Sequence, residues 1–276
     1  MLNNRLFYFS LIIFIIVFLS YQFRNRIINL YYLTYFKSES YSSGNYSRSL
    51  KYRLYKPETV VDKLYPLLLY LHPSGQNGSD NKQQISNLVF EWAKNESQSS
   101  FPCYIIVPQC PEGKEWVDKG PMNLPFQHYN QNNYPETDEM KMIVEIILKM
   151  VKKFPVDSGR IYVIGYSMGA TGCWDILSRY PDLFTASIIS SGVSDTTKAY
   201  KLVNIPVWVF SGENDSVAPA HLNKTMVESI TSRGGIAKLT ILKAEGHDIG
   251  HVSFTYPGVK DWLFDQMKQE TNKIRN

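Results

Sequence analysis

The sequence predicts an α/β domain built on a mainly parallel, doubly wound sheet. Short apolar runs alternate with helical patterns along most of the 276 residues, and this alternation is typical of strands joined by crossover helices. The chain contains 44% hydrophobic and 20% charged residues, a composition typical of a globular protein with a large core. Disorder, collagen and repeat arrays are therefore excluded.

Charge and cysteine content exclude several classes of protein. The net charge is +4, and three arginines without any acid lie within residues 1–28, so the rest of the chain is nearly neutral. A neutral body argues against a nucleic-acid partner. Cys103, Cys110 and Cys173 are too few and too widely spaced for a disulfide scaffold, and the absence of a Cys-x-x-Cys pair argues against a zinc site.

The first element is an apolar run at residues 6–23, which contains no charged residue. A helix of this length spans roughly 27 Å, close to the hydrocarbon core of a bilayer. No Ala-x-Ala-like cleavage pattern follows, so we favour an uncleaved single-pass membrane anchor over residues 1–28; cleavage as a signal peptide would instead give a secreted protein. Arginines flank both ends of the run, so the side of the membrane that holds the body of the chain stays open.

A Tyr- and Ser-rich polar stretch follows, and we interpret residues 29–49 as a linker. Residues 50–270 then predict one domain. Apolar runs bounded by turn residues predict seven strands in it. They lie at residues 50–55, 66–71, 104–107, 161–164, 186–189, 207–210 and 237–242.

Helical patterns lie between these strands. The clearest is at residues 138–154, where apolar side chains recur at helical spacing and lysines occupy the other face. Further helices are predicted at residues 83–92, 168–179, 221–233 and 258–269. The connection at residues 108–137 is long enough to form a lid or the wall of a binding site.

A short motif typical of a catalytic serine lies between one predicted strand and the helix that follows it. The motif GYSMG at residues 165–169 directly follows the strand at 161–164 and directly precedes a helix. A sharp strand-to-helix turn would lift Ser167 Oγ clear of the sheet, and the helix amino end would stabilise negative charge. A tight turn without a nucleophile is the alternative, but the strand and helix on either side favour Ser167 as a nucleophile.

A serine nucleophile needs a base and an acid that orients the base, and here both would follow on loops after later strands. The loop after the sixth predicted strand contains Asp215, which we predict to hold the imidazole, with Glu213 as the second candidate. The loop after the seventh contains His247, the predicted base, with His251 as the second candidate.

The negative oxygen of an acyl-transfer intermediate needs two backbone N–H donors. We predict the amides of Met168 and Ser74, the latter because Pro73 in the same loop has no N–H; an ordinary polar turn is the alternative for that loop. Trp116 and Tyr166 are candidates for substrate binding, although aromatic side chains more often pack in a core.

Over residues 50–267 the chain resembles serine esterases of the α/β-hydrolase fold, nearest a group of peptidase-like, polyhydroxybutyrate-depolymerase-like and phospholipase/carboxylesterase-like proteins. The matching motifs are residues 71–81 (LHPSGQNGSDN), 107–110 (VPQC) with Trp116, 157–169 (DSGRIYVIGYSMG), 179–184 (RYPDLF), 212–215 (GEND) and 246–247 (GH). The resemblance implies an α/β-hydrolase fold and a triad of Ser167, Asp215 and His247. It also supports the amides of Ser74 and Met168 as oxyanion donors. Family members usually have Gly where this chain has Pro73.

These residues predict a serine hydrolase that cleaves carboxylic esters through an acyl-enzyme and needs no metal or organic cofactor. The expected partners are a small-molecule or polymer-linked ester and the membrane. A serine peptidase or amidase is the alternative within this chemistry. A catalytically silent binding protein of the same fold is the alternative from another class.

Overall fold

The computed structural model describes residue 27 and residues 30–119 and 124–268. The apolar run at residues 6–23, predicted as a membrane anchor, lies outside the described residues. Among the helices that are described, none has both the length and the apolar character needed to cross a bilayer.

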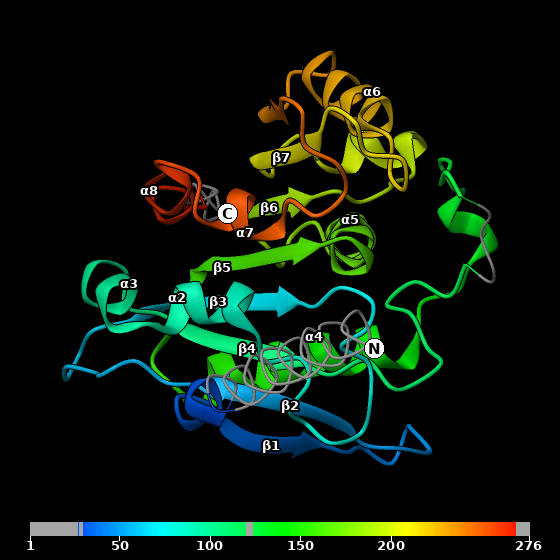
Figure 1. Ribbon diagram of the computed structural model, residues 1–276. Helices are drawn as coiled ribbons and strands as arrows, with labels where there is room; N and C mark the ends of the chain where they lie inside the picture. The colour runs from blue at the N-terminus through cyan, green and yellow to red at the C-terminus, as the bar shows by residue number, and fades with distance from the viewer. Residues whose placement is uncertain (1–26, 28–29, 120–123, 269–276) are drawn as a thin grey trace, which may run out of the picture.

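The described residues form one eight-stranded sheet with the order β1-β2-β4-β3-β5-β6-β7-β8. Figure 1 shows the strands stacked from β1 (blue) at the bottom to β7 (yellow) at the top. The strands from β4 to β8 along this order pair in parallel, and β1 and β2 add an antiparallel edge. The bounds are β1 (Lys37–Tyr41), β2 (Leu50–Tyr55), β3 (Tyr65–Leu71), β4 (Tyr104–Pro108), β5 (Val156–Tyr166), β6 (Ala186–Ser190), β7 (Val207–Gly212) and β8 (Ala237–Leu242). All seven predicted strands are present.

Strand β1 corrects the interpretation of residues 29–49 as a linker. Residues 37–41 pair antiparallel with β2 at the edge of the sheet. Their side chains are exposed or half-buried, so no apolar run marks the strand in the sequence. The hydroxyls of Tyr41, the last residue of β1, and of Tyr46, beyond the strand, donate to the Glu145 carboxylate on α4 (Asp138–Lys153), at 2.5 and 2.8 Å. The folded domain therefore extends upstream of residue 50.

The long helices lie where the sequence predicts them. Helix α5 (Met168–Arg179) has the predicted bounds, and α4 begins at the predicted residue because the Thr137 hydroxyl accepts the amide of Met140 as an N-cap. The other elements are α2 (Asn87–Ala93), α3 (Asn95–Ser100), α6 (Ala220–Thr231), α7 (Gly250–Phe254), α8 (Val259–Phe264) and the 3-10 helices η1 (Gln131–Asn133) and η2 (Thr196–Lys201). Helix α8 ends well before residue 269, and α3 and α7 were not predicted.

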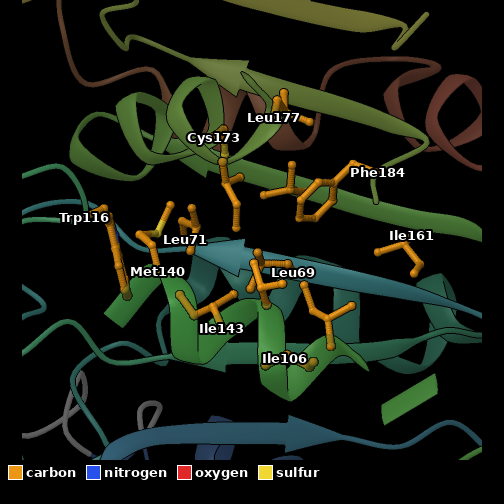
Figure 2. Packing of buried hydrophobic residues seen from close by; sticks show 14 of the residues in the cluster. Leu69, Leu71, Ile106, Trp116, Met140, Ile143, Ile161, Cys173, Leu177 and Phe184 are labelled. Atoms are coloured by element: carbon orange, nitrogen blue, oxygen red, sulfur yellow. The ribbon is translucent and has the colours of Figure 1, made fainter. Parts of the chain in front are cut away.

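Two hydrophobic clusters cover the two faces of the sheet. Side chains alternate along β3: Leu67 and Leu69 join the cluster that contains residues of α4, α5 and α6, whereas Leu68 and Tyr70 join the one with α2, α7 and α8. Figure 2 shows the first cluster between the strands and helices α4 and α5. Because both faces are covered, the open positions for a site lie at the carboxyl ends of the parallel strands.

Candidate active site

Ser167 lies on a sharp turn between β5 and α5. Its φ is 54° and its ψ is −116°, a backbone conformation that residues other than glycine rarely adopt. Two backbone hydrogen bonds hold this turn: the Ser167 amide donates to the carbonyl oxygen of Ser190 at 2.9 Å, and the Ser167 carbonyl oxygen accepts the amide of Thr171 at 3.1 Å. The sequence motif thus folds into the predicted strand-to-helix turn.

Close packing of main chain against main chain places this turn beside the end of β3. A Cβ atom added to Gly169 would lie 1.9 Å from the carbonyl oxygen of Leu71, so only glycine fits at this position. The start of α5 therefore lies against the segment that leads into Ser74.

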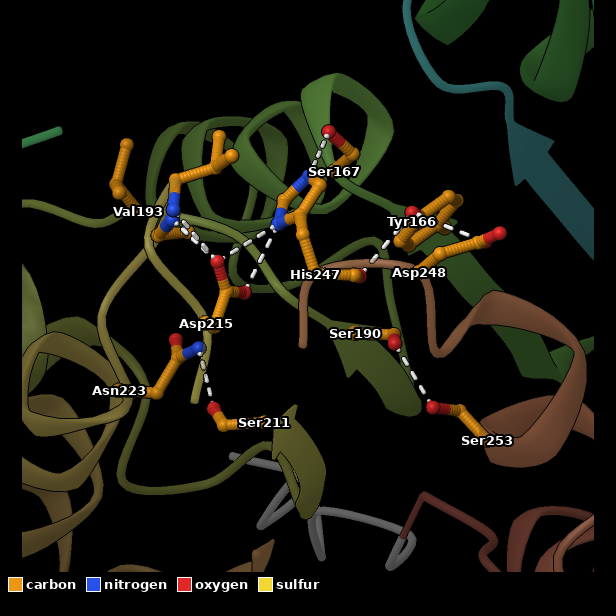
Figure 3. Close-up of polar contacts among 12 residues, drawn as sticks. Tyr166, Ser167, Ser190, Val193, Ser211, Asp215, Asn223, His247, Asp248 and Ser253 are labelled. Atoms are coloured by element: carbon orange, nitrogen blue, oxygen red, sulfur yellow. Dashed lines mark hydrogen bonds and ion pairs between the residues drawn. The ribbon is translucent and has the colours of Figure 1, made fainter. Parts of the chain in front are cut away.

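Three residues from separate loops form one hydrogen-bonded chain, shown in Figure 3. Ser167 Oγ lies 2.8 Å from His247 Nε2, and His247 Nδ1 lies 2.9 and 3.0 Å from the two carboxylate oxygens of Asp215. The Asp215 side chain is fully buried, whereas that of His247 is 21% exposed. The structure thus brings together the three residues that the sequence predicts as nucleophile, base and acid.

Asp215 is held as a carboxylate. Burial raises the pKa of Asp215, but the hydrogen bonds from His247 and from the amides of Ala218 and Val217 outweigh burial and keep its pKa below the ordinary value. Each of the two amides donates to Oδ1 at 2.8 Å. An ionised Asp215 fixes the proton of His247 on Nδ1, so that Nε2 is free to accept the Ser167 hydroxyl proton.

The second candidates lie elsewhere. Glu213 Oε2 accepts the amide of Ala244 at 3.0 Å, and His251 is exposed on α7. Within the described part of the chain, neither side chain is hydrogen-bonded to Ser167 or His247.

His72 fixes the loop that carries Ser74. Its Nδ1 lies 2.7 Å from the carbonyl oxygen of Pro73, and its Nε2 accepts the amide of Cys110 at 3.0 Å. Burial lowers the pKa of His72 to about 4, against the opposing effect of the hydrogen bond to Pro73. The ring is therefore neutral and donates from Nδ1 to Pro73, which holds the peptide just before Ser74.

The two predicted oxyanion donors line one cavity with Ser167. The amides of Ser74 and Met168 donate no hydrogen bond to any other described residue, so both N–H groups are available to a ligand. The cavity has a volume of about 390 Å³. Its lining residues are Pro73, Ser74, Glu115, Lys119, Leu124, Phe126, Tyr166, Ser167, Met168, Thr171, Ser191, Val217 and His247.

The long connection at residues 108–137 supplies one wall of this cavity. Leu124 and Phe126 contribute apolar surface, and Glu115 and Lys119 form an ion pair at 2.9 Å. The amide of Phe126 donates to the carbonyl oxygen of Val217 at 2.8 Å, which joins this wall to the loop that carries Asp215. The sequence predicts that this connection forms a wall or lid, but only isolated apolar residues in a polar loop, such as Leu124 and Phe126, mark the side chains that line the cavity.

The prediction that Trp116 binds substrate is wrong. Its side chain is fully buried, and its indole N–H donates to the carbonyl oxygen of His72 at 3.0 Å. The two rings lie with their centroids 5.0 Å apart. Trp116 therefore supports His72 from the core side, whereas Tyr166 does line the cavity.

No metal site accompanies this arrangement in the described residues, where no group of three or more His, Cys, Asp or Glu side chains could hold an ion. A separate polar cavity of about 440 Å³ lies beside Glu136, Arg179 and Lys198, and none of its lining residues also lines the cavity at Ser167.

The sheet order, with a serine on the turn between β5 and α5, defines an α/β hydrolase. The model of the dienelactone hydrolase family matches residues 107–251. The chain belongs to the dienelactone hydrolase family.

Solved structures agree with this fold. A thermostable esterase is 28% identical with a TM-score of 0.75, and the match covers 85% of this chain and 64% of the esterase. An acylaminoacyl peptidase, solved with the chloromethyl ketone of Z-Gly-Gly-Phe, is 13% identical with a TM-score of 0.55 over 85% of this chain and 42% of its own, so it supports the fold alone. The chain thus spans less than two thirds of either neighbour. A comparison with curated proteins found no match.

Proposed function

We propose that this hydrolase cleaves carboxylic esters through an acyl-enzyme formed on Ser167. The observation that carries the proposal is the unbroken hydrogen-bond chain from Asp215 through His247 to Ser167 at the edge of a cavity. The family supports hydrolysis, and the similarity to a thermostable esterase supports an ester as the bond that is cleaved.

In the first half of the reaction, His247 Nε2 takes the proton from Ser167 as Oγ attacks the ester carbonyl. The Asp215 carboxylate stabilises the resulting imidazolium. The carbonyl oxygen becomes negative and accepts hydrogen bonds from the amides of Ser74 and Met168. The alcohol then leaves with the proton held by His247, and the acyl group stays on Ser167.

In the second half, His247 removes a proton from a water molecule that attacks the acyl group. The acid leaves, and the proton returns to Ser167 Oγ. His247 makes each proton transfer in both halves, and water is the second reactant. The size of the cavity and its apolar wall of Leu124, Phe126 and Val217 favour a short or medium-length apolar group on the ester.

Hydrolysis of p-nitrophenyl esters with acyl chains from acetyl to octanoyl tests this proposal. We expect Ser167→Ala to lower kcat at least about a thousandfold and to abolish labelling by a fluorophosphonate. Ser187→Ala is the matched control, because Ser187 is a buried serine on β6 whose hydroxyl donates to the carbonyl oxygen of Val163; we expect it to keep kcat.

The same assay separates the alternatives. Hydrolysis of acyl p-nitroanilides with a kcat/KM equal to that of the matching esters would make the protein a peptidase or amidase. A folded protein that neither turns over esters nor reacts with the fluorophosphonate would be a binding protein. Attachment to a membrane through residues 1–28 stays a prediction from the apolar run at residues 6–23.

A further inference from the structure

We propose that Tyr166 is a positioning residue that holds the His247 loop against Ser167; this inference rests on the proposed function. The Tyr166 hydroxyl donates to the carbonyl oxygen of His247 at 3.1 Å, and Asp248 Oδ1 lies 3.4 Å from the same hydroxyl. Figure 3 shows this link on the side of His247 opposite to Asp215.

The hydrogen bond from Tyr166 to His247 matters because of where Tyr166 lies in the chain. Tyr166 directly precedes Ser167 at the end of β5, so the hydrogen bond joins the nucleophile turn to the base loop without passing through Asp215. Two neighbouring residues therefore both contact His247: Tyr166 through the backbone carbonyl oxygen and Ser167 through the imidazole.

Packing fixes the Tyr166 ring as well as its hydroxyl. The ring centroid lies 5.6 Å from that of the imidazole, and the side chain is buried. A Cβ atom added to Gly250 would lie 2.9 Å from Tyr166 Cδ1, so the start of α7 presses on the ring. Because the ring is held between the imidazole and α7, its hydroxyl keeps a fixed place relative to β5 and to the loop that carries His247.

Asp215 and Tyr166 restrain different parts of His247. Asp215 binds the imidazole and sets its tautomer and rotation, whereas Tyr166 binds the backbone. The loop that carries His247 also contacts the loop after β7, because the amide of Asn214 donates to the carbonyl oxygen of Glu245 at 2.8 Å. The hydrogen bond from Tyr166 holds the same loop on the side that faces Ser167.

The hydroxyl remains a donor during turnover. Burial raises the pKa of Tyr166, and the carboxylates of Asp248 and Asp215 raise it further. The phenol therefore stays protonated wherever His247 acts as a base, and the link does not open with pH.

Substitution of Tyr166 by Phe removes the hydroxyl and keeps the ring that lines the cavity. We expect kcat for p-nitrophenyl butyrate to fall about two- to tenfold, the effect of one hydrogen bond, while KM stays the same. Tyr162→Phe is the matched control: Tyr162 lies four residues earlier on the same face of β5, and its hydroxyl donates to the carbonyl oxygen of Gln266 at 2.6 Å. We expect that variant to keep kcat.

A second measurement distinguishes positioning from a general structural role. In a His247→Ala background there is no imidazole to position, so adding Tyr166→Phe should leave the residual rate unchanged. An equal loss of rate with and without His247, or an unchanged kcat in Tyr166→Phe alone, would overturn the inference. If His247→Ala itself kept full activity, the proposed function would fail instead.

Discussion

His72 is a buried, neutral histidine whose two ring nitrogens both have partners, the carbonyl oxygen of Pro73 and the amide of Cys110. A charged imidazolium could not accept the Cys110 amide. The ring thus holds the loop that carries Ser74 only in its neutral form, so the stability of the fold should depend on the protonation of His72.

Protonation of His72 should destabilise the fold in acid. The pKa of an unfolded histidine is about 6.5, and burial lowers the folded-state pKa to about 4. Between these values the unfolded chain binds a proton that the folded chain does not, so the contribution of His72 to the free energy of unfolding is fully present only above about pH 6.5. It falls by up to about 3 kcal/mol as the pH drops to 4. Urea unfolding at pH 7.5 and 4.5 measures this loss.

The control for that measurement is His72→Asn, which removes the titrating ring. This variant should be less stable at both pH values and should lose less stability between them. An equal loss in the two proteins would show that other groups cause the acid sensitivity.

Residue-level prediction from the sequence succeeded where chemistry fixes both residue type and order. Ser167, Asp215 and His247 could be predicted to meet because each follows a strand whose carboxyl end lies at the same edge of a parallel sheet. The environment of Trp116 could not be predicted, because an aromatic residue in a loop can face a cavity or the core. Its indole faces the core, where His72 offers an acceptor.

Helix α4 and the edge of the sheet are joined through one carboxylate. Glu145 accepts from the hydroxyls of both Tyr41 and Tyr46. This hydrogen bond is the main cause that raises the pKa of Tyr41, whereas burial and then the hydrogen bond raise that of Tyr46. The side chains of β1 are exposed or half-buried, so this junction adds to the pairing with β2 in holding the strand in place.

Glu145→Ala should therefore lower the free energy of unfolding by about 1–3 kcal/mol and leave kcat unchanged, since the junction lies away from the lining of the cavity. Urea unfolding and the p-nitrophenyl ester assay measure the two effects. Lys152→Ala, an exposed change on the same helix, is the matched control and should be neutral. A loss of kcat in Glu145→Ala at full stability would contradict this assignment.

Elements with a strong local pattern could be predicted, and those that depend on tertiary contacts could not. Strands β2 and β8 have the predicted bounds. Strand β1 is polar because it lies at the sheet edge. Helix α7 has five residues, too few for a helical repeat of apolar side chains to show in the sequence.

The whole described domain is organised by a sheet that both hydrophobic clusters share. Neighbouring residues of β3 enter opposite clusters, so neither face can lose its packing without disturbing the strands of the other. We infer that the two clusters unfold together.

Ile143→Ala on α4 and Val89→Ala on α2 test this cooperativity from opposite faces; both side chains are fully buried. Each should lower the free energy of unfolding by about 1–5 kcal/mol. In both variants the transitions followed by circular dichroism and by tryptophan fluorescence should coincide. Separate transitions in either variant would show that the faces unfold independently.

The contact between Gly169 and the carbonyl oxygen of Leu71 also bears on how this hydrolase can evolve. The two segments that carry the Met168 and Ser74 amides meet there through main-chain atoms, so the identity of surrounding core side chains does not set their spacing. Substitutions in the core can therefore change the thermal stability of the domain while the spacing of these two backbone segments stays the same. Gly169 is the residue that must stay unchanged for this spacing to be kept.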